Sequence, residues 1–173
     1  MLKRILTLIL AIVITLFNVN ITFAKNNKDI IKPIKVFNLE NGQTVIIKEI
    51  HTNPIVTIDS WVRTGSINEN DKNNGVSHFL EHLIFKGTEK YKAGEADYIL
   101  ESKGATYNAG TSKDFTHFYV TIGSEYFDLA LPIHADMITN AVIPEEELKK
   151  ERKVVIEEIL RSKDNPERQA FDN

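Results

Sequence analysis

Residues 75–87 read GVSHFLEHLIFKG, and this stretch decides the central part of the fold. Its apolar residues recur at the spacing of an amphipathic helix, and they are Val76, Phe79, Leu80 and Leu83. Gly87 suits the position just beyond a helix C-terminus. The stretch therefore predicts a helix over residues 75–85 with one apolar face.

Two histidines on this predicted helix indicate a metal site. His78 and His82 are four residues apart, so both imidazoles lie on one face and can point at one cation. Glu81 borders the same face. The order H-x-x-E-H inverts the H-E-x-x-H order of many zinc peptidases. A chance cluster on a helix surface is the alternative, because short motifs of this kind also arise without function.

A catalytic zinc site needs a third protein ligand besides two imidazoles. The chain has no cysteine, so the ligand must be another histidine or an acid. The segment ERKVVIEEI offers Glu151, Glu157 and Glu158. Glu151 and Glu158 are two helical turns apart and share a face, whereas Glu157 points about 100° away. The residues alone leave Glu151 and Glu158 open. The other histidines show no such pattern and are expected to be structural or exposed: His51, His117 and His134.

The remaining pattern predicts an α+β fold with a mainly antiparallel sheet packed on helices. Alternating or β-rich segments predict strands at 36–39, 44–47, 55–63, 105–110 and 115–122. Asn41-Gly42 predicts a tight hairpin with two residues of positive φ. Helices are expected at 94–102, at 125–140 and after Pro144, with a kink or break at Pro132. Val154, Val155 and Ile159 give the last helix an apolar side for docking.

The first residues predict export. Lys3 and Arg4 precede an apolar run, and Thr22-Phe23-Ala24 supplies small residues for cleavage. We expect a signal peptide at 1–24, a flexible lead-in at 25–34, and a periplasmic or extracellular mature chain. An uncleaved membrane anchor is the alternative, although the apolar run is short for a span.

Net charge excludes one class of partner. The formal charge is −3 and no block of basic residues is present, so nothing indicates nucleic-acid binding.

Three segments in order resemble one protein family: HFLEHLIFKGTEKY, NAGTSKDFTHFYV and ERKVVIEEI. They are similar to the amino-terminal part of the pitrilysin-type, inverted-motif zinc metallopeptidases, the family that includes insulin-degrading enzyme and the mitochondrial processing peptidase. The resemblance covers nearly all of residues 35–173, which we expect to form the amino-terminal zinc-peptidase domain, a half-domain of metallohydrolase type.

The resemblance implies a role for each matching residue. His78, His82 and Glu158 would bind Zn²⁺, with Glu158 standing 76 residues beyond His82, as the family pattern requires. Glu81 would be the general base. Glu151 would support the catalytic site from behind the ligands, and Asn108 would contact the backbone of an extended peptide substrate lying along the strand at 105–110.

The resemblance also implies a partner, because family members close two or more such domains around the substrate. We expect the domain to be incomplete at its carboxyl end, and cleavage to need a second homologous half or subunit. A non-catalytic zinc-binding scaffold subunit is one alternative. A lyase of the S-ribosylhomocysteine type is another, but its third ligand is a cysteine, which this chain lacks.

Overall fold

A computed structural model describes residues 32–164 and divides the chain into two compact units, Met1–Asn53 and Pro54–Asn173. The predicted signal peptide lies outside the described residues, so export stays a prediction. Among residues 32–164, no helix combines the length and apolar character that crossing a membrane requires.

The described part of the first unit is a two-stranded antiparallel hairpin. Strand β1 (Lys35–Asn38) pairs with β2 (Thr44–Ile47), as expected from the sequence. The turn differs from the expectation. Only Gly42 has a positive φ, at 84°, and Asn41 does not. The backbone N–H of Leu39 donates to the carbonyl of Gln43, so a longer loop replaces the two-residue Asn-Gly turn.

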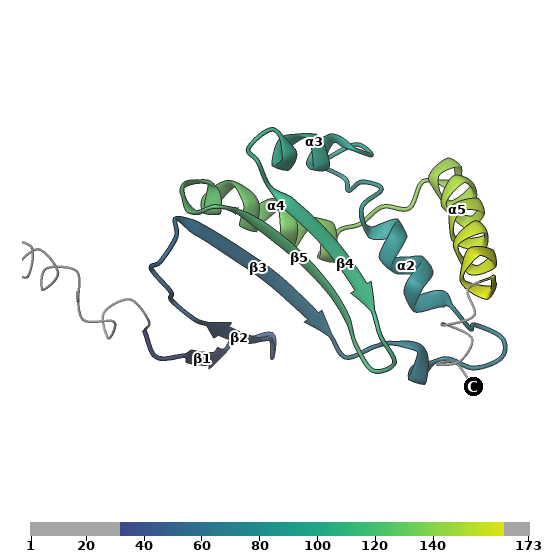
Figure 1. Ribbon diagram of the computed structural model, residues 1–173, viewed down its shortest axis with the longest axis horizontal. Helices are drawn as coiled ribbons and strands as arrows, with labels where there is room; N and C mark the ends of the chain where they lie inside the picture. Colours follow the sequence, from purple (N-terminus) through teal and green to yellow (C-terminus); the bar gives the residue numbers. More distant parts are fainter. Residues whose placement is uncertain (1–31, 165–173) are drawn as a thin grey trace, which may run out of the picture. The chain divides into compact units, whose positions relative to one another are not determined.

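A three-stranded antiparallel sheet forms the centre of the second unit (Figure 1). Its strands are β3 (Ile55–Val62), β4 (Thr106–Thr111) and β5 (Thr116–Gly123), in the order β3-β5-β4. Alternate residues of β5 are buried, because successive side chains point to opposite faces of a sheet. Within this unit, β4 is an edge strand of the described sheet.

Between residues 54 and 164, four α-helices accompany the sheet, which confirms the predicted α+β class. They are α2 (Val76–Ile84), α3 (Glu95–Glu101), α4 (Phe127–Thr139) and α5 (Glu145–Lys163). Two 3-10 turns precede α2 and α4, at Ser66–Asn68 and Ser124–Tyr126. The expected break at Pro132 is wrong, since α4 continues through it. Pro132 is the sixth residue of α4, where its missing N–H removes only one early hydrogen bond.

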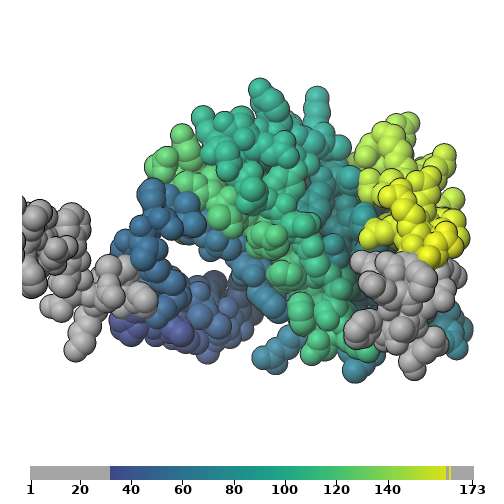
Figure 2. Space-filling model, in the orientation of Figure 1, coloured from purple at the N-terminus to yellow at the C-terminus, as the bar shows by residue number. Residues whose placement is uncertain are grey.

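The core lies between the sheet and helices α3 and α4. Its fully buried side chains include Leu100, Val120, Ile122 and Ile133. Helix α2 lies between the sheet and α5 (Figure 1). Fewer apolar side chains of α5 are buried than the sequence predicts. Val155 is buried, but Val154 and Ile159 are exposed. Figure 2 shows α5, in yellow, as a surface element of this unit.

Leu100 is a fully buried core position, with only 1% of its surface exposed. We expect Leu100→Ala to lower the free energy of unfolding by about 2–5 kcal/mol, because it removes buried methyl groups and leaves a cavity. Leu160 offers a matched control, since it is 55% exposed on α5. Leu160→Ala should change stability by no more than about 0.5 kcal/mol. Equal losses in chemical denaturation would contradict this core.

Candidate metal centre

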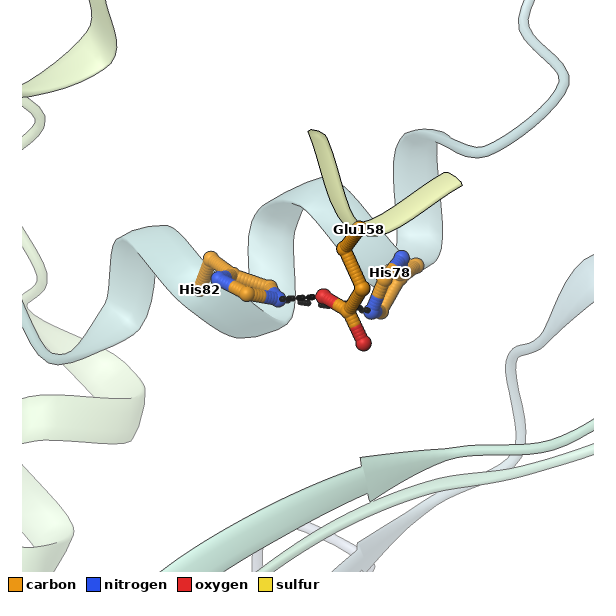
Figure 3. A group of neighbouring side chains, drawn as sticks. All are labelled: His78, His82 and Glu158. Carbon is orange, nitrogen blue, oxygen red and sulfur yellow. Dashed lines mark hydrogen bonds and ion pairs between the residues drawn. The ribbon is translucent and has the colours of Figure 1, made fainter. Parts of the chain in front are cut away.

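Two helices bring the three predicted ligands together. His78 and His82 project from one face of α2, and Glu158 reaches them from α5 (Figure 3). The two Nε2 atoms are 3.3 Å apart. The Oε2 atom of Glu158 lies 3.8 Å from Nε2 of His78 and 3.5 Å from Nε2 of His82.

These separations fit a zinc ion. Zinc binds imidazole nitrogen and carboxylate oxygen at about 2.0–2.2 Å, and tetrahedral angles then place two ligand atoms about 3.3–3.6 Å apart. A point equidistant from the three atoms lies about 2 Å from each, within that bonding range. The donors are also of the right type, since Zn²⁺ readily takes two histidines and one carboxylate as a catalytic set. Glu158 is 48% exposed, so the group is open to solvent on one side.

Glu151 fixes the ring of His82 from behind. Its Oε2 lies 3.3 Å from Nδ1 of His82, and its Oε1 lies 2.7 Å from Nζ of Lys86. Burial by itself would raise the pKa of Glu151, but Lys86 and His82 outweigh it, and the pKa is lowered. The carboxylate is therefore ionised near neutral pH and can only accept. For the neutral ring, this acceptor favours the tautomer with the proton on Nδ1 of His82, which leaves the Nε2 lone pair for a metal.

Glu81 lies on α2 one residue before His82 and is half-buried. Its Oε2 accepts a hydrogen bond from the hydroxyl of Thr111, the last residue of β4. This contact ties the metal-binding helix α2 to the edge strand β4.

Asn108 lies farther along β4 and is exposed. Its Oδ1 accepts the backbone N–H of Ala109 at 2.9 Å, and its partner across the sheet is Tyr119. The structure therefore places Asn108 on the edge strand, outside the group formed by His78, His82 and Glu158.

The sequence pattern missed several residues that support the centre. Lys86, Thr111 and Glu69 each contact a residue or helix of the site through tertiary packing. Glu157, which the helical periodicity places off the face shared by Glu151 and Glu158, forms an ion pair with Arg161. The remaining histidines all have partners elsewhere: His51 contacts Glu49, His117 contacts Asp59, and His134 contacts Ser60. Burial lowers the pKa of His134, as expected for a neutral core imidazole.

The fold and the ligand group together define an α+β metalloprotein of the H-x-x-E-H type. The sequence profile of the family described as Insulinase (Peptidase family M16) matches residues 44–173. The chain belongs to this family, and the resemblance found in the sequence is confirmed. Membership favours the peptidase interpretation over the lyase.

Individual relatives agree with this assignment. An uncharacterized zinc protease of Bacillus subtilis is 40% identical over 134 residues, which cover 78% of this chain and 33% of that protein. The mitochondrial-processing peptidase subunit beta of Bos taurus is 37% identical over 134 residues, covering 78% and 27%. The crystal structure of a protease from Helicobacter pylori superposes with a TM-score of 0.74 at 32% identity, covering 79% and 33%.

The comparisons also bear on the cofactor and on length. Relatives in two bacterial genera are named zinc proteases, and the described residues contain a matching ligand group, so the expectation of Zn²⁺ is confirmed. The chain spans about a third of the length of the relatives that it matches.

The contact between Glu151 and His82 predicts a tautomer. In the metal-free chain, His82 should carry its proton on Nδ1, and Glu151→Ala should lower the fraction of this form by removing its fixed acceptor. The measurement is nitrogen NMR of the imidazole ring. Glu147→Ala is a matched control, because Glu147 also lies on α5 but faces Lys150. An unchanged His82 spectrum in Glu151→Ala would refute this role.

Proposed function

We propose that this chain supplies the zinc-binding part of a metalloendopeptidase that hydrolyses extended peptides. One observation carries the proposal: His78, His82 and Glu158 present three ligand atoms at separations suited to zinc. Glu81 lies on the same helix, one residue before His82. Family membership supports it, because peptidases of this family share the inverted motif. His78, His82 and Glu158 would hold the ion.

When bound, zinc supplies Lewis acidity, which lowers the pKa of a coordinated water toward 7 and polarises the substrate carbonyl. Proton transfer and the orientation of the ligands would depend on residues of this chain. Glu81 would accept the proton of the attacking water and deliver it to the leaving amine. Thr111 would keep the Glu81 carboxylate oriented through its hydroxyl. Glu151 and Lys86 would hold His82 in the tautomer that leaves Nε2 free.

The substrate would bind as an added strand. Strand β4 has β5 on one side only within the described sheet, so its other edge offers backbone groups to a peptide. Backbone hydrogen bonds give affinity with little sequence preference, which suits a general peptide substrate. Asn108 would exchange its bond to Ala109 for contact with the substrate backbone.

Cleavage would need groups from a second half or subunit. The relatives are about three times as long as the part that this chain matches, and one of them is named as a subunit. We propose that the remaining length in such proteins closes over the peptide, while the present residues supply the metal and the base.

Glu158 should be the acid that binds zinc. We expect Glu158→Gln to weaken zinc binding by more than the roughly 10-fold that loss of a supporting residue costs, because it removes a charged ligand. Glu157→Gln is a matched control on the adjacent residue, which faces Arg161. Elemental analysis and competition with a chelating dye measure both. Equal zinc affinity in the two variants would reject Glu158 as the ligand.

Glu81→Gln should separate binding from chemistry. We expect the variant to keep full zinc content and to lose at least about 100-fold in peptide cleavage, because the amide cannot accept a proton. The assay uses a quenched peptide and the chain supplemented with a carboxyl-terminal part of a related protein. Retained turnover would exclude Glu81 as the base. A wild-type chain that binds zinc but never cleaves would favour the scaffold alternative.

A further inference from the structure

Glu69 lies in the loop between β3 and α2 and contacts the first turn of the metal-binding helix. Its Oε2 accepts the backbone N–H of Gly75 at 2.6 Å, and its Oε1 accepts the backbone N–H of Ser77 at 2.8 Å. Both carboxylate oxygens are thus committed to the start of α2. Ser77 is buried and immediately precedes His78.

The start of α2 depends on this outside acceptor. The first N–H groups of any helix lack partners within the helix and usually bond to a side chain at the N-cap. Here the N-cap is Gly75, which has a left-handed φ of 88° and no side chain to accept them. Glu69 therefore accepts the hydrogen bonds that an N-cap side chain would otherwise accept. Its negative charge also interacts favourably with the positive end of the helix dipole.

Glu69 is itself held by the turn between β4 and β5. The N–H of Ser66 donates to the carbonyl of Ser112 at 3.2 Å, and the N–H of Ile67 donates to the carbonyl of Lys113 at 2.7 Å. Gly65 permits this approach, because a Cβ there would lie 2.3 Å from the carbonyl oxygen of Ser112. The loop is thus hydrogen-bonded to the hairpin at the positions three and two residues before Glu69.

The same hairpin also holds the middle of α2. Thr111 precedes that turn and bonds to Glu81, while the turn carries the loop that presents Glu69. The contacts at Ser77 and Glu81, four residues or about one turn apart along α2, therefore depend on one hairpin. Together they restrict both the rotation of the helix about its axis and its sliding along that axis, which determine where His78 points.

We propose that Glu69 is a positioning residue for the zinc site, acting through the first turn of α2 to aim His78 at the point where His82 and Glu158 converge. The inference rests on the proposed function, since it assigns Glu69 a purpose only if the three ligands bind zinc. Glu69 touches neither metal nor substrate.

The test is zinc affinity and Co²⁺ absorption of the full chain carrying Glu69→Gln. The glutamine keeps one acceptor oxygen but presents its amide NH₂ group, a donor, to the second N–H, so the first turn of α2 loses one bond and the charge. Glu95→Gln is a matched control, because Glu95 accepts the backbone N–H of Lys92 at the start of α3, which carries no ligand of the site. Competition with a chelating dye is measured at a temperature where circular dichroism shows all proteins folded.

We expect Glu69→Gln to weaken zinc binding on the order of tenfold and to change the visible bands of bound Co²⁺, because the ligand field changes when His78 turns. Glu95→Gln should lower the melting temperature without either effect. If Glu69→Gln merely melts earlier and keeps wild-type affinity and Co²⁺ bands, the positioning role is wrong. A wild-type chain that binds no zinc would instead overturn the proposed function, and it is recognised before any variant is compared.

Discussion

The convergence of two imidazole nitrogens and a carboxylate oxygen within 3.8 Å is the constraint on which the second unit depends. Groups rich in lone pairs do not gather in this way without a proton or a cation between them. The surrounding contacts serve to hold α2 against α5. Val155 of α5 is buried, and the pair formed by Lys86 and Glu151 adds charge complementarity where the side chains are partly shielded from water.

Much of this arrangement could be predicted because it depends on local periodicity. The spacing of His78 and His82 fixes their common face on a helix regardless of what surrounds it. The same reasoning removed Glu157 from the ligand candidates. It could not choose between Glu151 and Glu158, since both lie on one face of α5. Only the resemblance to the family selected Glu158, and the structure then placed Glu151 against the opposite ring nitrogen.

Contacts that join distant segments lay beyond the sequence pattern. In the sequence, Glu69 is a loop residue and Thr111 a strand-end residue, and neither belongs to a recognisable motif. Their roles arise from tertiary contacts with α2, which Glu69 makes at the start of the helix and Thr111 makes at Glu81. The continuous helix through Pro132 has the same origin. An isolated helix is weakened by proline, but α4 buries Ile133 and Met137 against the sheet, and that burial outweighs one lost hydrogen bond.

The exposed edge of β4 has a consequence for self-association. A bare strand edge is a template on which a second copy of the same protein can pair, and natural proteins blunt such edges. Asn108 covers the N–H of Ala109 with its own side chain, which withdraws one donor from the row that a neighbouring chain would need. A second copy could use this N–H only if the bond were exchanged, so Asn108 disfavours accidental pairing at the same position where we expect it to contact a peptide substrate.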